Sequence, residues 1–372
     1  MLLESLWKFN CDEPVLGIEL LDLSQNMQIN FIAYSKKGNL IFLSSDGQLK
    51  LKQEICTENP IWTIKLFDFD NDGNIEIAVG GMDGILRVYK IPDLYELNHY
   101  WSHKFSSSIS GILTNDINKN GQSEIIVYSL DKTLRVLNPV NGKLIWGQVF
   151  QDGIEDAVIL ESSESKIEQI LIACGNDGTV RAFSLKNGDL IWFKSFSDKI
   201  RFVDYIKSKN DTIIVCGGDD KELHFISKES KEEIKSFKFD DYVWKCLSFP
   251  NPQKKSILVS TYSFEYLNHS KKLQHIQFTS KLVHINKDLE IIWELKNKNI
   301  EVIKRFQMHS RNFIAIGTTQ GELIILDELS GNMRYNIKQD SCVNAIQYEK
   351  LANLLIICYE NGTIDAYHID IN

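Results

Sequence analysis

Residues 170–192 read ILIACGNDGTVRAFSLKNGDLIW, which is three apolar runs separated by Asp177-Gly178 and Asn187-Gly188. Asp-Gly and Asn-Gly pairs tolerate a positive φ and form the tight turns that join antiparallel strands. Runs of four to eight residues that are rich in Ile, Val and Phe are typical of strands. The stretch therefore predicts three consecutive antiparallel strands, the last of which carries Trp192.

The same pattern recurs along the chain with a period of about 46 residues. A fourth apolar strand precedes each group, such as IWTIKLFDF (61–69) and EDAVILES (155–162). Four antiparallel strands repeated at this spacing are typical of a β-propeller, and we find no convincing amphipathic helix. The repeated three-strand groups are IEIAVGGMDGILRVYKI (75–91), SEIIVYSLDKTLRVLNPVNGKLIW (123–146) and FIAIGTTQGELIILDELSGNMRY (313–335).

The fold predicted is all-β: a single eight-bladed propeller domain over residues 1–372, built of four-stranded antiparallel blades. The count rests on apolar strands near residues 15, 62, 109, 155, 200, 242, 302 and 342, with seven blades as the alternative. The first strand, which holds Trp7, has no three strands before it, and the last unit lacks a fourth strand. Pairing residues 5–10 with 363–370 closes the array and removes its open edges.

Composition excludes several classes of protein. Hydrophobic residues make up 43%, charged residues 24% and the net charge is −9, which argues against nucleic acid or an anionic membrane as the main partner. The N-terminus has no signal-peptide pattern and no stretch is long and apolar enough to insert directly into a membrane. Seven widely spaced cysteines without a CxxC pair favour reduced thiols and a cytoplasmic location, and a disulfide framework or zinc site stays an alternative.

Two segments resemble known propeller repeats. DFDNDGNIEIAVGGMDGILRVY (68–89) resembles the FG-GAP/VCBS repeats of integrin-α-like propellers, and also units of BBSome subunits and nutrient-signalling scaffolds. GTVRAFSLKNGDLIW (178–192) resembles the repeat of quinoprotein (PQQ) propellers, in which Gly-x-x-x-Trp closes the unit. WD-repeat proteins fit less well, because their Gly-His and Trp-Asp pairs are absent. The resemblance implies a propeller fold and, for the integrin-type repeats, bound calcium.

An acidic loop at 68–76 is the candidate metal site. Calcium takes six to eight oxygen ligands, and alternate positions around a glycine turn can direct oxygens to one point. A second copy lies at 116–124 and an eroded third begins at Asp22. The alternative is that these residues form Asx turns without a metal, as the intracellular scaffold relatives suggest. The candidate ligands are Asp68, Asp70, Asp72, the Asn74 carbonyl and Glu76, and in the second loop Asp116, Asn118, Asn120 and Glu124.

No catalytic motif is present. The sequence lacks HExxH, GxSxG and GxxxxGK[ST], and its eight histidines form no metal-ligand pair of the usual spacing. A quinone-dependent dehydrogenase needs a cover of long loops and a calcium ligand set that these short connections do not supply. We therefore expect no enzyme activity, no catalytic residue and no required cofactor, with Ca²⁺ as an optional ligand.

An insertion at residues 263–279 lengthens one blade and is the candidate partner-binding segment. Long insertions on a compact β scaffold are disproportionately functional. The alternative is an extended hairpin that packs on its own neighbouring blade. The residues expected to bind a partner are Phe264, Tyr266, Lys271, Lys272 and Phe278.

The function expected is a non-enzymatic intracellular scaffold for protein–protein interaction, with its oligomeric state left open. Resemblance to BBSome-type and nutrient-signalling propellers implies a membrane-trafficking or small-GTPase-linked complex, by analogy of fold alone. The alternative is a propeller that binds calcium or a small ligand in an axial channel, including an enzyme of that kind. A metal or a small molecule found in the channel would favour the alternative.

Overall fold

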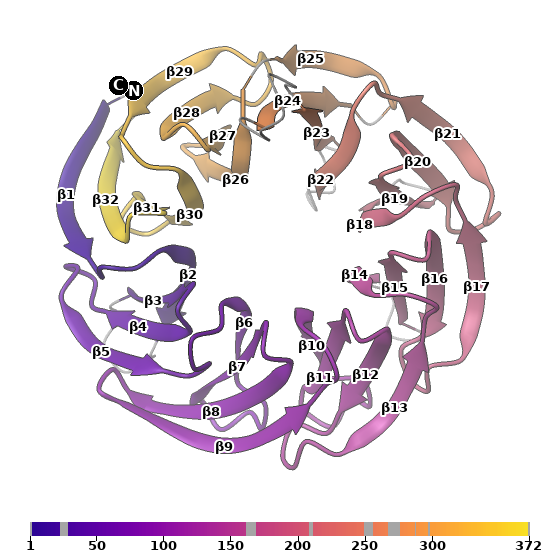
Figure 1. The fold of residues 1–372 in the computed structure, drawn as a ribbon, viewed down its shortest axis with the longest axis horizontal. Coiled ribbons are helices and arrows are strands. Elements are labelled where there is room, and N and C mark those ends of the chain that lie inside the picture. The colour runs from indigo at the N-terminus through magenta and orange to yellow at the C-terminus, as the bar shows by residue number, and fades with distance from the viewer. Residues whose placement is uncertain are drawn as a thin grey trace. The chain divides into compact units, whose positions relative to one another are not determined.

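The computed structural model describes residues 2–22, 29–160, 169–207, 211–248, 256–266, 276–286, 288–296 and 298–370. Within these residues 32 strands form eight four-stranded antiparallel sheets, and no helix is present (Figure 1). The architecture is that of an all-β, eight-bladed propeller, as predicted, and the seven-bladed alternative is wrong. No apolar helix long enough to cross a membrane occurs in the described residues.

Two compact units divide the chain, and each is described by itself. The first comprises Met1–Ile126, Leu137–Lys143 and Ile300–Asn372. It contains four complete sheets and the start of a fifth. Their strands are β1(Leu2–Asn10) with β30(Val343–Glu349), β31(Leu354–Tyr359) and β32(Thr363–Asp370); β2(Val15–Asp22), β3(Ile29–Ser35), β4(Asn39–Leu43) and β5(Leu49–Glu54); β6(Ile61–Phe67), β7(Ile75–Gly81), β8(Ile85–Asp93) and β9(Glu96–Lys104); β26(Ile300–Met308), β27(Arg311–Thr318), β28(Glu322–Asp327) and β29(Met333–Lys338); and β10(Ile109–Asn115).

The second unit comprises Val127–Val136 and Leu144–Asn299. It holds three complete sheets and part of the sheet that β10 begins. Its strands are β12(Thr133–Leu137) and β13(Leu144–Val149), which follow β11(Glu124–Ser129); β14(Ile154–Leu160), β15(Ile170–Gly175), β16(Thr179–Ser184) and β17(Leu190–Ser195); β18(Ile200–Lys207), β19(Thr212–Gly218), β20(Glu222–Ser227) and β21(Glu233–Lys238); and β22(Tyr242–Ser248), β23(Ile257–Tyr266), β24(Ile276–Ile285) and β25(Ile291–Leu295).

The two chain ends complete one blade, as the sequence predicts. Strand β1 pairs antiparallel with β32, with Leu3 opposite Ile369 and Trp7 opposite Ala366. Figure 1 shows β1 alongside β32, with both ends of the chain together. The Cys11 backbone N–H continues the pairing and donates to the Gly362 carbonyl oxygen at 3.0 Å. The first strand in the sequence is therefore the last strand of the final blade.

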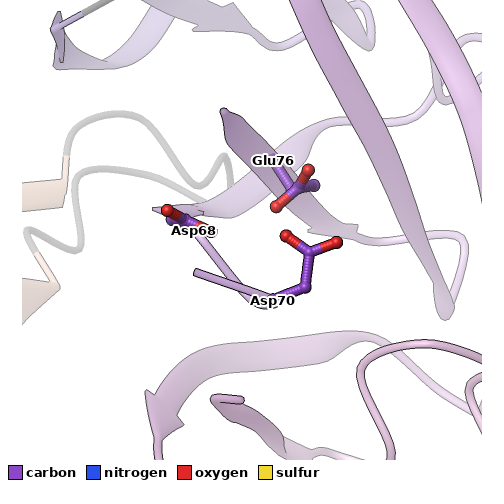
Figure 2. A group of neighbouring side chains, drawn as sticks. All are labelled: Asp68, Asp70 and Glu76. Carbon is purple, nitrogen blue, oxygen red and sulfur yellow. The ribbon is translucent and has the colours of Figure 1, made fainter. Parts of the chain in front are cut away.

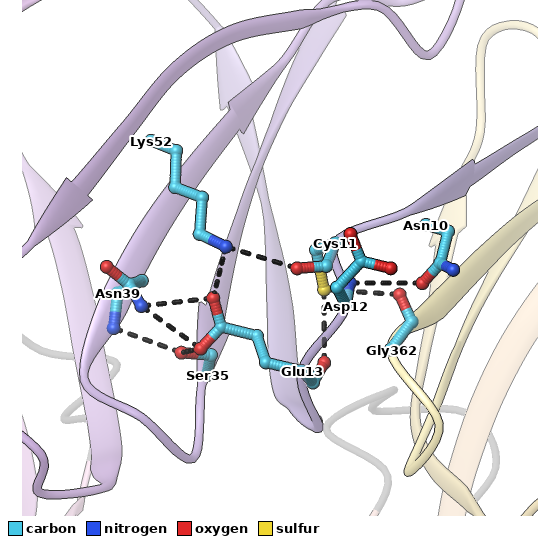
Figure 3. A network of polar contacts seen from close by, with 8 residues as sticks. All are labelled: Asn10, Cys11, Asp12, Glu13, Ser35, Asn39, Lys52 and Gly362. Atoms are coloured by element: carbon cyan, nitrogen blue, oxygen red, sulfur yellow. Dashed lines mark hydrogen bonds and ion pairs between the residues drawn. The ribbon is translucent and has the colours of Figure 1, made fainter.

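A buried carboxylate fixes the turn that follows β1 (Figure 3). Glu13 is buried, and its oxygens accept hydrogen bonds from Ser35 Oγ at 2.7 Å and Asn39 Nδ2 at 3.0 Å. Lys52 Nζ lies 2.6 Å from Glu13 Oε1 and donates to the Cys11 carbonyl oxygen at 3.1 Å. Burial alone would raise the pKa of Glu13, but these donors outweigh it and lower the pKa. The charge is therefore stabilised by full pairing.

The apolar core lies between adjacent sheets, because the middle strands are covered on both faces. Strands β11, β15 and β31 are buried along nearly their whole length, whereas β17 and β21 alternate between exposed and covered residues. In the first unit one cluster joins residues of β2–β4 to residues of β31 and β32. In the second unit another joins β15–β17 to β18–β20. Burial on both faces explains the continuous apolar runs, and one exposed face explains the alternation.

The tryptophan of one Gly-x-x-x-Trp unit contacts the glycine of the next unit. The Trp146 side chain packs on Gly188 in the turn before β17, and its Nε1 donates to the Leu185 carbonyl oxygen at 3.1 Å. A Cβ at Gly188 would lie 2.6 Å from the Trp146 ring, and the glycine has φ +78°. In the first unit Trp101 packs on Gly142 in the same way. The turn of the next blade has a glycine at this point, and the tryptophan ring of the preceding blade fills the space that a side chain would otherwise occupy.

The first strand of a blade carries a register shift near its start. Ile61 pairs with Gly81, but Gly80 pairs with Thr63, so Trp62 is an extra residue on β6. A shift of this kind is a β-bulge, which redirects a side chain and is common beside functional sites. The same shift occurs in six further first strands, where the extra residues are Leu16, Glu155, Arg201, Trp244, Glu301 and Asn344. The bulges place side chains of five residue types at equivalent points of seven blades.

The predicted insertion belongs to strands β23 and β24. Both strands are ten residues long, and Phe264 pairs with Phe278 and Tyr266 with Ile276 in their backbone register. Lys271 and Lys272 lie outside the described residues. The role predicted for these five residues in partner binding stays a prediction.

Candidate functional site

The acidic loop after β6 brings three carboxylates together (Figure 2). Asp68 and Asp70 lie in the turn and Glu76 lies on β7, and one oxygen from each is within 4.8 Å of the other two. Figure 2 shows the Asp70 and Glu76 carboxylates facing each other. Three of the five residues named for this loop therefore lie close together, and their role as metal ligands stays a prediction.

The other two residues named as ligands, Asp72 and Asn74, take part in the hydrogen bonds of the turn, and their role as metal ligands stays a prediction. The backbone N–H groups of Asp72 and Gly73 donate to the two Asp68 carboxylate oxygens at 3.1 and 2.8 Å. The Asn74 N–H donates to Asp72 Oδ1 at 2.7 Å. The bond from Asn74 to Asp72 is an Asx turn, and Asp68 holds the loop through backbone groups four and five residues further on. Asp72 and Asn74 are not part of the three-carboxylate group.

Glu76 is the buried member of the group. Its side chain is fully buried, and Oε2 accepts the Phe69 backbone N–H at 3.2 Å. Neither Oε1 of Glu76 nor Oδ1 of Asp70 accepts a hydrogen bond from the residues that the structure describes. Burial, with smaller contributions from Asp70 and Asp72, raises the pKa of Glu76 to about 7. Buried acceptors without donors are costly, so this pair of oxygens is suited to a bound cation.

Lys90 is the nearest basic side chain. Its Nζ lies 3.9 Å from Asp70 Oδ2 and 4.0 Å from Glu76 Oε1, beyond hydrogen-bond distance. The ammonium also lies 5.3 Å from the ring centroids of Phe69 and Tyr100. Lys90 therefore offsets part of the negative charge without supplying a donor to either unpartnered oxygen.

The second acidic loop is closed by its own side chains. Asp116 accepts the backbone N–H groups of Asn120 and Gly121 at 3.0 and 2.8 Å, as Asp68 does in the first loop. Asn118, however, donates from Nδ2 to Glu124 Oε1 at 2.6 Å, and the Ile117 N–H donates to Oε2. Asn118 stands where the first loop has Asp70, and its amide supplies the buried Glu124 with a hydrogen-bond donor. The side chains of the second loop therefore form the hydrogen bonds expected of a turn with a structural role.

A second candidate site lies at the bulge of β6. Trp62 is 49% exposed, although the first strand of a blade is otherwise largely covered. Met82 follows Gly81, the partner of Ile61, and is 54% exposed; its N–H donates to the Pro60 carbonyl oxygen. An exposed tryptophan and methionine at one end of a blade have the composition of a protein-binding surface. We call these two residues the Trp62 surface.

The second unit has a related arrangement at the bulges of β14, β18 and β22. Arg201 forms a bidentate pair with Asp219 at 2.8 and 2.7 Å and lies 3.3 Å from Glu155. Its guanidinium lies 5.6 Å from the Trp244 ring centroid, and Trp244 is 38% exposed. The arginine is already paired, so Trp244 is the side chain of this group that is open to a partner.

Sequence reasoning missed Trp62 and Trp244 because it treated them as ordinary residues of apolar strands. The sequence does contain a pattern that distinguishes them. Both follow a β-branched residue at or next to the start of a first strand, in Ile61-Trp62 and Val243-Trp244, whereas the other tryptophans lie on the last strand of a blade. A bulge cannot be read from composition, so the exposure of these two rings required the structure.

Comparison with known proteins supports the fold. The family model described as outer membrane protein assembly factor BamB, a PQQ-type repeat model, matches residues 57–205. The chain is similar to the quinoprotein-like β-propellers. This confirms the predicted resemblance at the level of the propeller superfamily. The matched residues cover less than half of the chain.

Three solved structures share the propeller fold over nearly the whole chain at low identity. BamB from Moraxella catarrhalis is 14% identical, with a TM-score of 0.65 and coverage of 100% of this chain and 99% of that one. Sqt1 from Saccharomyces cerevisiae is 9% identical, with a TM-score of 0.76 and full coverage of both. The computationally designed Ika8 protein is 14% identical, with a TM-score of 0.72 and 98% coverage of both. None of the curated proteins matches the sequence.

Proposed function

We propose that this protein is a non-enzymatic propeller scaffold that binds a protein partner through the Trp62 surface. The propeller fold is compatible with such a role, and the observation that carries the proposal is the exposure of Trp62 at a β-bulge. Exposing a large aromatic ring to water costs the free energy that burial would gain, of the order of 2 kcal/mol. A tryptophan redirected outward by a bulge is accounted for by a partner that covers it.

The surroundings of Trp62 favour a protein partner over a small molecule. Met82 adapts to irregular apolar surfaces, and Ser108 holds the Met82 carbonyl by a hydrogen bond of 3.3 Å from its Oγ. The exposed Glu58 comes two residues before Pro60, whose carbonyl oxygen accepts the Met82 N–H. Apolar anchors with a charged rim are the usual composition of a non-obligate interface.

The test is a purification of the tagged full-length protein from its native cell, with quantitative identification of stoichiometric partners. Trp62→Ala is expected to lower recovery of the partner at least tenfold, as hot-spot truncations do. Tyr95→Ala is the matched control, because Tyr95 is an exposed aromatic residue in the β8–β9 turn, at the other end of the same blade. Equal recovery with both variants, in protein of unchanged thermal stability, would contradict the proposal.

A more specific part of the proposal concerns where in the cell the protein acts and which kind of complex it joins. All seven cysteines are free thiols, and five of them are buried, which supports a reducing, cytoplasmic environment. The resemblance of the acidic loop to units in BBSome-type and nutrient-signalling propellers supports a trafficking or small-GTPase-linked complex. The match to BamB, whose family description names an assembly factor, also supports a role within an assembly.

A divalent cation bound by the acidic loop is a second candidate function. The three carboxylates of Asp68, Asp70 and Glu76 fit a hard cation, because two of their buried oxygens lack a donor. A bound Ca²⁺ would supply positive charge and hold the loop, with no role in a reaction. Calorimetric titration of Ca²⁺ into chelator-treated protein is expected to give one site, and no heat of binding would contradict this function.

A further inference from the structure

Four first strands of the first unit carry polar side chains at one equivalent point. Each of these strands has the register shift of a β-bulge near its start, and the point is the third residue after the bulge residue. Strand β30 contacts β26 and β2, and β2 also contacts β6, so the four points follow one another in that order. The residues there are Lys304 on β26, Gln347 on β30, Glu19 on β2 and Lys65 on β6.

The second unit has no lysine at the equivalent point of its bulged first strands. In β14, β18 and β22 the third residues after the bulge are Val158, Asp204 and Leu247. The two lysines are therefore particular to the first unit, and the blade repeat itself does not account for them.

The Glu19 carboxylate is the centre of this group. Gln347 is buried, and its Nε2 donates to Glu19 Oε2 at 3.1 Å. The Gln347 Oε1 accepts the Tyr348 backbone N–H at 3.1 Å, which fixes the amide in this orientation. The charges of Lys304 and Lys65 both act on Glu19, although burial outweighs them and raises its pKa. Glu19 therefore lies near basic side chains that come from the strands on either side of it.

The two lysines carry one positive charge more than Glu19 neutralises. Both are half-buried. In the part of the chain that the structure describes, neither lysine forms a hydrogen bond or a close ion pair with an acidic side chain. Burial lowers the pKa of Lys304, and the charge of Glu19 opposes this only in part. A further negative group beside Lys304 would therefore stabilise its ammonium group.

Tyr34 adds a hydroxyl group to the same face of β2. It is opposite Gly17 in the β2–β3 register, and a Cβ at Gly17 would lie 2.0 Å from the Tyr34 hydroxyl oxygen. The ring therefore covers Gly17, which shares a strand face with Glu19 two residues further on. Burial and the charge of Glu19 raise the pKa of Tyr34, so the hydroxyl keeps its proton and can donate it in a hydrogen bond.

We propose that Lys304, Lys65 and the Tyr34 hydroxyl bind a small oxyanion, which is a phosphate or a carboxylate group. Ammonium and hydroxyl groups donate to such oxygens, and hydrogen bonds between charged groups are the stronger ones. A singly charged oxyanion balances the excess positive charge of the group. Gln347 holds Glu19 in place and leaves the lysine donors to the anion.

A cation is a poorer occupant of this site, because two ammonium groups repel it. The chain carries a net charge of −9, so an anion is attracted only where positive charge is concentrated locally. The inference does not rest on the proposed function. Trp62 is exposed, whereas Lys65, three residues further along β6, is half-buried.

The experiment is a calorimetric titration of the full chain with inorganic phosphate at neutral pH and constant ionic strength. A parallel titration with acetate separates the two kinds of oxyanion, and we expect one site per chain for at least one of them. Lys304→Met keeps the apolar stem, removes the charge and is expected to weaken binding about tenfold. Lys338→Met is the matched control, because Lys338 is exposed on β29, the last strand of the same blade, and the variant loses the same charge. It is expected to leave binding unchanged.

Glu19→Gln provides a test of the opposite sign. It removes the negative charge beside the anion and is expected to strengthen binding about fivefold. Thermal unfolding checks that each variant folds, and Lys65→Met tests the same claim if Lys304→Met does not fold.

Three results would overturn the inference. They are the absence of binding by both anions, equal weakening in Lys304→Met and Lys338→Met, and weaker binding in Glu19→Gln. Recovery of a protein partner with Trp62→Ala is a separate measurement, so failure of the anion site leaves the proposed function standing, and the reverse also holds.

Discussion

Asn118 donates a 2.6 Å hydrogen bond from Nδ2 to Oε1 of Glu124, and Asp70, 48 residues earlier, has no N–H to give to Glu76. The two loops otherwise fold alike, with Asp68 and Asp116 each accepting two backbone N–H groups. One side chain therefore decides whether the buried glutamate is satisfied within the protein.

Exchanging these two residues is expected to exchange the properties of the loops. Asp70→Asn supplies the missing donor and is expected to raise the free energy of unfolding by about 1 kcal/mol, while any Ca²⁺ binding at this loop falls at least tenfold. Asn118→Asp removes the donor at the second loop and is expected to lower the free energy of unfolding by about 1 to 2 kcal/mol. Denaturant unfolding and calorimetric titration measure both. Destabilisation by Asp70→Asn in metal-free buffer would contradict this reading of the loops.

His224 is expected to make the stability of the protein depend on pH. Three turns in other blades carry an Asp–Arg pair four residues apart, at Asp83–Arg87, Asp131–Arg135 and Asp177–Arg181. In β20 the arginine is replaced by His224, whose Nε2 lies 2.9 Å from Asp220 and whose Nδ1 lies 3.2 Å from Glu233. Burial works to lower the pKa of His224, but the hydrogen bond and charge of Asp220, with Glu233 and Glu222, outweigh it and raise the pKa.

A raised pKa in the folded state means that protonated His224 stabilises the fold. This contribution is complete below the unfolded pKa of about 6.5 and is lost as pH rises through the higher folded value. His224→Arg is expected to remove the dependence, because arginine stays charged. Thermal unfolding between pH 5 and pH 9 checks this, with Arg181→Lys as a control that keeps its charge. A pH profile that is the same in wild type and His224→Arg would contradict the prediction.

Gly188 is expected to tolerate no side chain. Gly188→Ala combines a positive φ with a Cβ 2.6 Å from the Trp146 ring and is expected to lower the free energy of unfolding by about 3 kcal/mol. Gly73 has φ +86° but nothing within 4 Å of its Cβ position, so Gly73→Ala is expected to cost only about 1 kcal/mol. The difference between the two variants, from denaturant unfolding, measures the steric part. Equal destabilisation would show that the contact with Trp146 contributes little.

The pairing of the two chain ends can be tested with an engineered disulfide. Glu4 and His368 are opposite each other in the β1–β32 register, and neither belongs to the buried core. Oxidation of the Glu4→Cys, His368→Cys double variant is expected to raise the free energy of unfolding by about 3 kcal/mol, because it closes a very long loop. Unfolding with and without reductant measures the effect. Each single variant is the control, and no intramolecular disulfide after oxidation would contradict the register.

Much of the fold follows from the sequence because the blade is a repeated local pattern. The strands predicted near residues 15, 62, 109 and 155 begin at Val15, Ile61, Ile109 and Ile154. The closing pair was predictable because Trp7 precedes Trp101 by two repeat periods. These features depend on short-range turn chemistry and on spacing, which a single sequence displays directly.

The candidate sites were less predictable, because they depend on differences between repeats. The sequence of the first loop suggests a set of five ligands. Whether Asp72 belongs to the turn or to the carboxylate cluster depends on which backbone N–H groups donate to its side-chain oxygens. The exposure of Trp62 depends on a bulge, and the grouping of Lys304 and Lys65 around Glu19 depends on the register that the bulges set. Neither is encoded in a periodic pattern, so sequence alone names the residue types without showing which side chains face solvent.

The hydrogen bond from Cys11 to Gly362 joins residues 351 positions apart. During synthesis on the ribosome β1 is made long before β32, so it has no sheet to join until β32 has followed. The blade that holds β1 is therefore completed only after β32 has been made. A chain that ends before Thr363 leaves β1 without its partner strand.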